Sequence, residues 1–332
     1  MTSSNWPAPG RRGRRRRSHR RWLGVLLVVP ALALLAAWLP GGMLFGASDS
    51  WRPATPEQRP DLDNAVAVGR ESGLPLYPCR GLIQGGMQLG RLRGDFGGCH
   101  IGYGGREVEV ASFEVLTSRW QRATGWDLPA GATPAGTLLD TSAVGGFTST
   151  GLYVCRAVHE GGLHPGQAEA RRKGCSFGFG GRIVVAQTYD MLENMPWTVW
   201  AAATPETVPE DAIVGGGEGG EPLLICRAAD STGLHPGKLR RSGKGCSIVS
   251  GGDELIVPRF EVLVPRWIAS KASAMPVAAM PMGRENAALQ FVCRARAGRD
   301  LQIGKASTSL EGCHVGMDGR EVIVGSFEVL SQ

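Results

Sequence analysis

Apolar and polar residues alternate with a period of two in short runs along most of the chain beyond residue 50. The segments Glu-Val-Glu-Val at 107–110 and Glu-Val-Ile-Val at 321–324 place β-branched residues where a half-buried strand needs them. Paired glycines at 104–105, 180–181 and 251–252 lie between apolar runs and predict hairpin turns, because glycine tolerates a positive φ. Helix signals are nearly absent outside the N-terminal segment. We therefore predict an all-β fold of antiparallel strands.

One unit recurs four times along the chain. Its clearest mark is a pair of cysteines 20 positions apart, at Cys79 and Cys99, Cys155 and Cys175, Cys226 and Cys246, and Cys293 and Cys313. An arginine follows each first cysteine, at Arg80, Arg156, Arg227 and Arg294. A leucine lies 37 positions after that cysteine, at Leu116, Leu192, Leu263 and Leu330. The constant spacing predicts four tandem repeats, at residues 51–120, 121–196, 197–266 and 267–332.

Two further marks accompany the unit. An aromatic residue stands near the end of each copy and is expected in the core, at Phe113, Tyr189, Phe260 and Phe327. Each copy begins near a tryptophan, at Trp51, Trp126, Trp197 and Trp267.

The cysteines are expected to form one disulfide within each repeat. Eight cysteines allow 105 connectivities, but a unit that carries both partners at a fixed separation favours local closure. Each disulfide contributes roughly 3 kcal/mol by loop entropy. A zinc site needs closely spaced ligand pairs such as C-x-x-C, which the sequence lacks, so we expect neither a metal nor another cofactor.

Positive charge is concentrated at the N-terminus. Residues 1–48 hold eight arginines and no acidic residue, although the whole chain has a net charge of only +6. The remaining chain carries a small negative excess and has no charge-based reason to bind DNA or RNA. Nucleic acid is therefore not an expected partner.

The arginines precede an apolar stretch at residues 22–39. We interpret residues 1–21 as a basic cytoplasmic tail and residues 22–45 as a signal anchor or a signal peptide. A retained anchor tethers the repeats to a membrane, outside the cytoplasm in the periplasm or extracellular space, and cleavage makes the chain a secreted protein.

Catalytic motifs are missing, and we do not expect an enzyme. His164 and His235 share a Leu-His-Pro-Gly turn in the second and third repeats, but the other copies carry Gln88 and Gln302 there. The repeated arginine is expected to pair with an acid near the end of its own repeat, for example Arg227 with Glu261. Direct contact of these arginines with a ligand is the alternative.

The third copy combines Glu-Pro-Leu-Leu-Ile-Cys-Arg-Ala, Gly-Leu-His-Pro-Gly-Lys-Leu, a Gly-Gly turn and a closing Phe-Glu-Val-Leu. In this order and across all four copies, the motifs resemble the DM-nine repeat family, also called natterin-like repeats. The resemblance implies antiparallel β repeats packed as pseudo-symmetric pairs, which we expect to be two tandem pairs. It also implies a lectin-like function, since some members bind mannose through an acid before the Pro-Leu motif and the lysine of Pro-Gly-Lys.

Carried over by position, the carbohydrate-binding pairs are Glu218 with Lys238 in the third copy and Glu285 with Lys305 in the fourth. The first copy has Glu71 with Arg91, whose guanidinium is not equivalent to a lysine ammonium. The second copy has Phe147 and Gln167, and we expect it to be silent. A carboxylate accepts hydrogen bonds from sugar hydroxyls while an ammonium donates to them.

These observations predict an exported or membrane-anchored protein that binds glycans or cell-surface carbohydrate, with mannose-type sugars as the candidate ligand. The alternative is a structural or protein-binding module of the cell envelope that has no sugar site, in which case the glutamate–lysine pairs are surface salt bridges.

Overall fold

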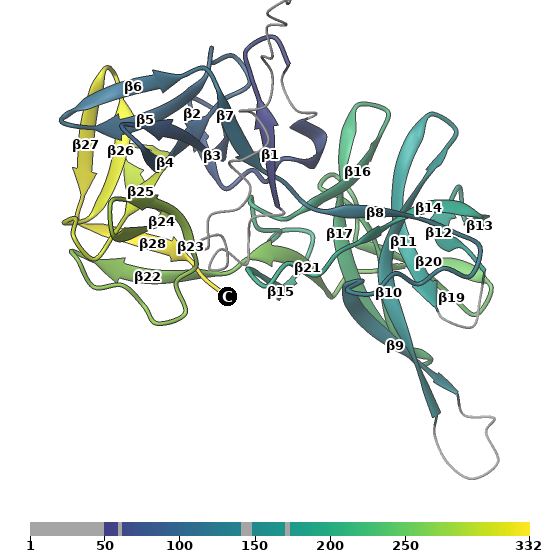
Figure 1. Cartoon of the computed structure of the whole chain (residues 1–332). Helices are drawn as coiled ribbons and strands as arrows, with labels where there is room; N and C mark the ends of the chain where they lie inside the picture. Colours follow the sequence, from purple (N-terminus) through teal and green to yellow (C-terminus); the bar gives the residue numbers. More distant parts are fainter. Residues whose placement is uncertain (1–49, 59–61, 141–147, 170–172) are drawn as a thin grey trace, which may run out of the picture. The chain divides into compact units, whose positions relative to one another are not determined.

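The structure, a computed structural model, describes residues 50–58, 62–140, 148–169 and 173–332 (Figure 1). The apolar stretch at residues 22–39 lies outside the described residues. In the described part of the chain, no helix is both long and apolar enough to cross a membrane. The single helical element there is the 3-10 turn η2 (Leu62–Asn64), and strands form the rest of the regular structure. The predicted all-β fold is confirmed.

Each repeat contributes seven antiparallel strands. Repeat 1 has β1 (Trp51–Ala54), β2 (Gly69–Glu71), β3 (Leu74–Ile83), β4 (Gly86–Leu92), β5 (Cys99–Tyr103), β6 (Arg106–Val110) and β7 (Phe113–Leu116). Repeat 4 has β22 (Trp267–Lys271), β23 (Pro281–Glu285), β24 (Ala288–Ala297), β25 (Asp300–Ala306), β26 (Cys313–Met317), β27 (Arg320–Val324) and β28 (Ser326–Leu330).

The two middle repeats follow the same order. Repeat 2 begins with Trp120, one residue before the predicted boundary, and has β8 (Trp120–Thr124), β9 (Pro134–Asp140), β10 (Thr148–His159), β11 (Gly162–Glu169), β12 (Cys175–Phe179), β13 (Arg182–Ala186) and β14 (Thr188–Leu192). Repeat 3 has β15 (Thr198–Ala203), β16 (Val214–Glu218), β17 (Glu221–Asp230), β18 (Gly233–Arg240), β19 (Cys246–Ser250), β20 (Asp253–Val257) and β21 (Phe260–Pro265).

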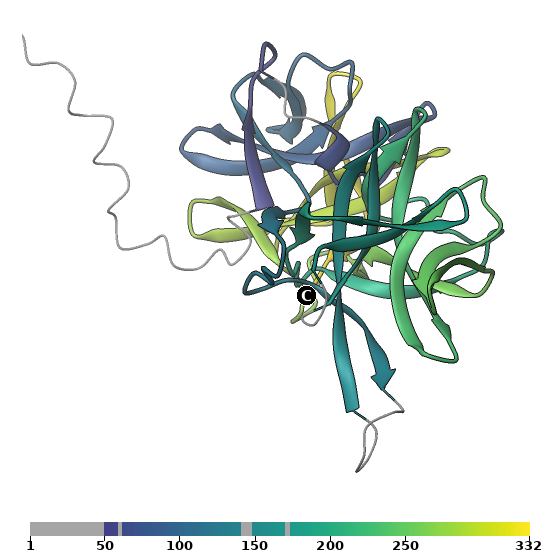
Figure 2. The same cartoon turned by 90° about the vertical axis from the view of Figure 1, so that its right-hand side faces the viewer.

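The repeats pair in a nested order. Repeat 1 shares a 14-stranded sheet with repeat 4, and repeat 2 shares a second one with repeat 3. In each pair the second strand of one repeat contacts the fourth strand of the other, and the contact occurs twice. Between repeats 1 and 4, β2 pairs with β25 and β23 pairs with β4. Between repeats 2 and 3, β9 pairs with β18 and β16 pairs with β11. Both views place β23–β27 beside the strands of repeat 1 (Figures 1 and 2). Pseudo-symmetric pairs are confirmed, but only the inner pair consists of neighbours along the chain.

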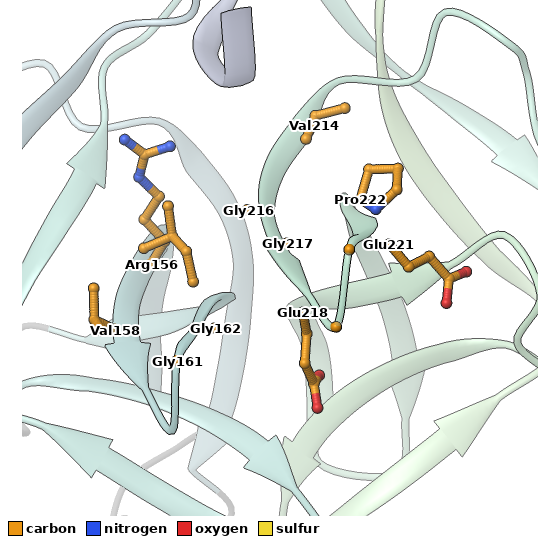
Figure 3. Close-up of a pocket in the computed structure, with 13 residues that line it drawn as sticks. Arg156, Val158, Gly161, Gly162, Val214, Gly216, Gly217, Glu218, Glu221 and Pro222 are labelled. Carbon is orange, nitrogen blue, oxygen red and sulfur yellow. The ribbon is translucent and has the colours of Figure 1, made fainter. Parts of the chain in front are cut away.

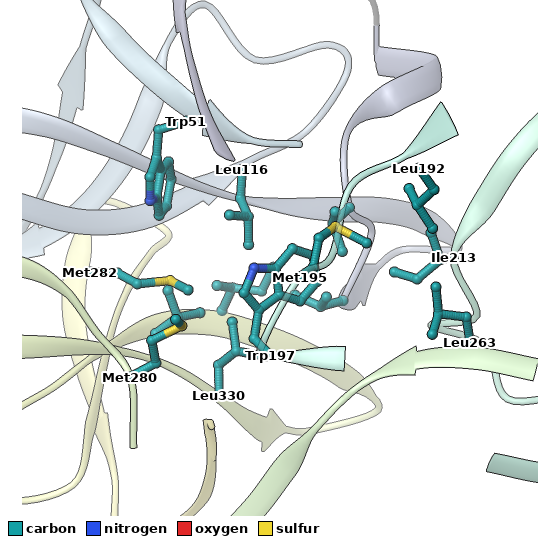
Figure 4. Packing of buried hydrophobic residues seen from close by; sticks show 14 of the residues in the cluster. Trp51, Leu116, Leu192, Met195, Trp197, Ile213, Leu263, Met280, Met282 and Leu330 are labelled. Carbon is teal, nitrogen blue, oxygen red and sulfur yellow. The ribbon is translucent and has the colours of Figure 1, made fainter. Parts of the chain in front are cut away.

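A central core joins all four repeats. The closing leucines Leu116, Leu192, Leu263 and Leu330 all belong to one buried cluster (Figure 4). Opposite each leucine, in antiparallel register, stands a tryptophan: Trp51, Trp120, Trp200 and Trp267. The equivalent tryptophans of repeats 2 and 3 are therefore Trp120 and Trp200, and not Trp126 and Trp197 as the sequence predicted. Trp126 is 56% exposed, whereas Trp197 is completely buried in the central core.

Each repeat also has a small core of its own, closed by its disulfide. All four predicted disulfides are present, with Cα atoms 5.8–6.0 Å apart. The predicted aromatic residues Phe113, Tyr189, Phe260 and Phe327 are buried in these cores. The paired glycines of the hairpin turns have positive φ, for example 62° at Gly104 and 79° at Gly105, as the turn prediction requires.

The repeated arginine has the structural role expected for it. Arg227 Nε lies 2.6 Å from Glu261 Oε2, and the same pairing joins Arg80 to Glu114, Arg156 to Asp190, and Arg294 to Glu328. Each guanidinium also lies 3.9–4.5 Å from the ring centroid of the equivalent tryptophan. A cation–π contact of this kind stabilises by roughly 0.5–2 kcal/mol. The arginines therefore connect the sheets to the central core.

Candidate functional site

The predicted carbohydrate-binding residues occupy two equivalent positions of the repeats, and the structure brings a third position beside them. The base position lies on the fourth strand and holds Arg91, Gln167, Lys238 or Lys305. The acid position lies at the end of the second strand and holds Glu71, Glu218 or Glu285. The turn position, named after the Leu-His-Pro-Gly turn that the sequence predicted, lies three residues before the base position and holds Gln88, His164, His235 or Gln302. The predicted turn is wrong, because these residues lie within the same fourth strands as the base position.

Base and turn positions contact each other across the repeat pair. Lys238 Nζ lies 3.1 Å from His164 Nδ1, and in return Gln167 Oε1 lies 3.2 Å from His235 Nδ1. In the outer pair, Lys305 Nζ lies 2.6 Å from Gln88 Oε1 and Arg91 NH1 lies 3.0 Å from Gln302 Oε1. The reciprocal contacts follow from the two-fold pairing of the sheets. Each candidate site is therefore built from two repeats.

In repeat 3 the predicted pair comes together. Lys238 Nζ lies 4.0 Å from Glu218 Oε2, at the limit of an ion pair. Glu218 also pairs with Arg240, so its charge is shared between two cations. Phe177 and Phe179 of repeat 2 place their ring centroids 5.8 and 5.6 Å from the lysine ammonium. The site thus combines a carboxylate, an ammonium and aromatic rings.

The charged state of Lys238 depends on its buried surroundings. Burial lowers the pKa of Lys238, while the nearby Glu218 carboxylate raises it. Burial, and then the adjacent Lys238, lowers the pKa of His164, which favours the neutral imidazole. His164 Nε2 lies 3.1 Å from the carbonyl oxygen of His159 and can donate to it, which leaves Nδ1 to accept from the lysine. His164 therefore positions the ammonium without adding a second charge.

Two cavities meet at Glu218. One, of about 340 Å³, is lined by Glu218, Lys238 and Phe179 together with Ser247 and Glu254. The other, of about 490 Å³, lies between the Gly161–Gly162 turn of repeat 2 and the glycine-rich segment around Gly216 and Gly217 of repeat 3 (Figure 3). Glu218 therefore belongs to the lining of both cavities.

The repeat 4 site is more enclosed. Lys305 is only 2% exposed, and burial lowers its pKa. The ring centroid of Tyr103, from repeat 1, lies 4.9 Å from its ammonium. Glu285 instead accepts a hydrogen bond from Gln290 Nε2 at 3.2 Å and lines a separate cavity of about 310 Å³. The Glu285 carboxylate partly offsets the lowering of the Lys305 pKa, but Lys305 donates to Gln88 and Glu285 accepts from Gln290. The acid and the base of repeat 4 are thus each hydrogen-bonded to a glutamine.

In repeat 1 the base position is filled by internal contacts. Arg91 pairs with both Glu71 and Glu107 and donates to the Gly316 carbonyl of repeat 4 at 2.5 Å. Glu71 also pairs with Arg93 at 2.5 Å. Both partners of the predicted pair are therefore engaged in a cross-repeat network that ties repeat 1 to repeat 4.

Repeat 2 carries a neutral residue at the base position. The Gln167 side chain faces His235, as described above, and Phe147 lies outside the described residues. The residues at the turn position could be recognised in the sequence as equivalent residues of the four repeats. No local sequence pattern showed that each of them contacts the base position of another repeat.

Comparison with known proteins identifies the family but not the ligand. No curated protein matches the chain. Among solved structures, a nematode sperm cell motility protein, MFP2B, matches with 14% sequence identity and a TM-score of 0.17, covering 85% of this chain and 96% of that one. The DM9 repeat family model matches residues 46–110, 71–144, 148–257 and 218–324. These matches span most of the chain and all four copies of the unit, and the chain belongs to the DM9 repeat family.

Proposed function

We propose that this protein binds carbohydrate and that its main site lies in repeat 3, at the contact with repeat 2. The observation that carries the proposal is the convergence of Glu218, Lys238 and Phe179 on one cavity of about 340 Å³. Sugar hydroxyls donate to a carboxylate and accept from an ammonium, while the C–H face of a pyranose packs against an aromatic ring. Repeat 3 offers all three kinds of contact in one place.

The ligand is proposed to be a glycan of several sugar residues. Glu218 lines the second cavity as well, together with the glycine-rich segment at Gly216 and Gly217 (Figure 3). A single hexose leaves the second cavity unused. Oligosaccharides should therefore bind more tightly than the monosaccharide at their end.

The repeat 4 site is proposed to be the weaker of the two. Lys305 is held by Gln88, and Glu285 opens to a cavity that the lysine does not line. Two unequal sites on one chain still raise avidity if both engage the same surface. The proposed role is binding without catalysis.

The proposed location is outside the cytoplasm. Four disulfides are typical of proteins in an oxidising, extracellular or secreted environment. The basic residues followed by the apolar stretch at 22–39 favour export through a signal anchor or a signal peptide.

A glycan array tests the proposal with three full-length proteins. They are the unchanged chain, Lys238→Met, and the control Lys271→Met, which removes an exposed lysine outside the cavity. We expect the unchanged chain and the control to bind the same glycans, with oligosaccharides preferred. Lys238→Met should weaken that binding by at least tenfold, because a charge-assisted hydrogen bond contributes about 1.5–3 kcal/mol.

Two outcomes contradict the proposal. If no glycan binds at high protein density, the envelope-module alternative is favoured. If binding survives both Lys238→Met and the charge reversal Glu218→Lys, the protein is a lectin whose site lies elsewhere.

A further inference from the structure

The cavity of about 310 Å³ in repeat 4 has a lining that accepts hydrogen bonds. Its polar side chains are those of Glu285, Asn286, Gln290, Ser307 and Ser309, and among the described residues no lysine or arginine lines it. We propose that this space, the repeat 4 cavity, binds an organic cation: a guanidinium or primary ammonium group carried by a small molecule. The proposal does not depend on carbohydrate binding at repeat 3.

The other repeats show which side chain fills this place elsewhere. Arg93 of repeat 1, Arg240 of repeat 3 and Ser307 of repeat 4 all lie 14 positions after the first cysteine of their repeat. Arg93 pairs with Glu71, and Arg240 pairs with Glu218. Repeats 1 and 3 thus carry their own guanidinium at the position where repeat 4 has a hydroxyl group.

Repeat 4 keeps the carboxylate but lacks that guanidinium. Glu285 occupies the acid position, as Glu71 and Glu218 do, and each of those two acids pairs with a second cation at the base position of its own repeat. Burial lowers the pKa of Lys305 and the Glu285 carboxylate raises it, while burial and then the same carboxylate raise the pKa of Tyr103. Neither of these residues lines the cavity. The carboxylate therefore faces the cavity with one of its two usual cations missing.

Smaller side chains leave room for a ligand. In repeat 3 the Arg240 guanidinium pairs with Glu221 as well as with the acid position. Repeat 4 has Ser307 in place of Arg240 and Ala288 in place of Glu221, and both of these smaller residues line the cavity. Its volume lies at the lower end of the roughly 300–1,000 Å³ of small-molecule sites. A small molecule can thus occupy the place of an arginine side chain.

An unpaired acceptor is a second, independent indication of a donating ligand. Gln290 lines the cavity and is only 1% exposed. Its Nε2 donates to Gln88 Oε1 at 2.8 Å and to Glu285 Oε2 at 3.2 Å, whereas its Oε1 has no hydrogen-bond partner among the described residues. An unpaired buried acceptor is destabilising. Guanidinium and ammonium groups carry donors and no acceptor, so they match both the amide oxygen and the carboxylate.

Calorimetric titration of the full-length chain with propylguanidinium chloride, glucosamine hydrochloride and N-acetylglucosamine tests the proposal. The first two probes carry a cation, and the third is the neutral counterpart of the second. Total ionic strength is held constant with sodium chloride, because surface electrostatics are screened by salt.

The variants use the differences between the repeats. Ser307→Arg places in repeat 4 the side chain that repeats 1 and 3 carry, and Glu285→Gln removes the charge at nearly constant size. The control Ser326→Arg adds the same arginine at an exposed position of repeat 4 where repeat 3 has the exposed Arg259. Thermal unfolding checks that all three variants remain folded.

We expect at least one of the two cations to bind the unchanged chain and the control equally. Ser307→Arg and Glu285→Gln should each weaken this binding on the order of tenfold or more, because the first fills the cavity and the second removes a charge-assisted hydrogen bond. Binding of both cations assigns the cavity to organic cations in general. Binding of glucosamine alone assigns it to an amino sugar, and binding of propylguanidinium alone assigns it to a guanidinium.

Three results would overturn the proposal. The first is that neither cation binds. The second is that Ser307→Arg and Glu285→Gln bind the cations as tightly as the unchanged chain. The third is that both variants weaken N-acetylglucosamine binding as much as glucosamine binding, which would show that the cavity takes a neutral sugar.

Discussion

The base positions of repeats 1 and 3 occupy the same place in the fold but differ in what surrounds them. Arg91 is paired with two carboxylates and a backbone carbonyl of the partner repeat. Lys238 contacts a neutral imidazole at 3.1 Å and a carboxylate at 4.0 Å, and it lines a cavity. Both side chains are nearly buried.

The difference shows how one position can serve two purposes. A guanidinium has five N–H donors, and in repeat 1 the partner repeat supplies acceptors for them, so the residue becomes part of the interface. An ammonium with a long ion pair keeps donor capacity for a ligand. We therefore expect Arg91 to contribute to stability and, under the proposed function, Lys238 to contribute to binding. Three measurements test this difference.

The largest effect is expected for Arg91→Ala. Its removal leaves Glu71 and Glu107, whose side chains are 13% and 11% exposed, without their shared cation. Breaking a buried pair in this way costs about 3–5 kcal/mol. Urea unfolding should show a loss of about 3 kcal/mol or more, with Arg91→Lys intermediate. A loss below 1 kcal/mol would contradict the structural role of the network.

A smaller effect is expected from pH through His164. Its folded pKa is lowered below the ordinary value of 6.5, so the unfolded state binds more protons between the two values. The free energy of unfolding should therefore rise as pH increases through this window and level off above 6.5, by about 1.4 kcal/mol per unit of pKa difference.

The matched variant is His164→Gln, which places in repeat 2 the residue that repeats 1 and 4 carry at the turn position. Urea unfolding at pH 5 and pH 7.5 should show a smaller difference in the free energy of unfolding between the two pH values than in the unchanged chain. Part of this difference should remain, because burial also lowers the pKa of His235. An unchanged difference would show that the pKa of His164 is not lowered in the folded protein.

The smallest effect on stability is expected for Lys238→Met. Burial disfavours the charged form of Lys238, and its ion pair with Glu218 is long, at 4.0 Å. Replacing such a buried charge with an apolar side chain often leaves the free energy of unfolding unchanged. The free energy of unfolding should change by no more than about 1 kcal/mol, while glycan binding falls. A loss as large as that of Arg91→Ala would show that both base positions are structural.

Much of the fold could be predicted from local signals. Alternation at 107–110 predicted strand β6, and paired glycines predicted the turn at Gly104 and Gly105. The Arg227–Glu261 pair was predictable because both residues recur at constant spacing in every copy. The tryptophan Trp120 was missed in favour of Trp126, since a tryptophan within a variable segment has no spacing that identifies its partner.

The candidate sites could be predicted only in part. The glutamate and lysine of repeat 3 were found by resemblance, and the structure places them 4.0 Å apart. His164 and Phe179 were missed as members of that site because they belong to another repeat, separated from Lys238 by 74 and 59 positions. Such contacts depend on which repeats pair, and no periodicity within one repeat encodes that.

The repeat, its disulfides and its internal arginine–acid pairs could be predicted from the chain alone, because each arises from residues at short and constant separation. The pairing of repeat 1 with repeat 4, and the enclosure of Arg91 where Lys238 instead lines a cavity, became known only from the folded arrangement. Burial and charge at these positions are properties of two repeats in contact, and one repeat carries only half of the residues that set them.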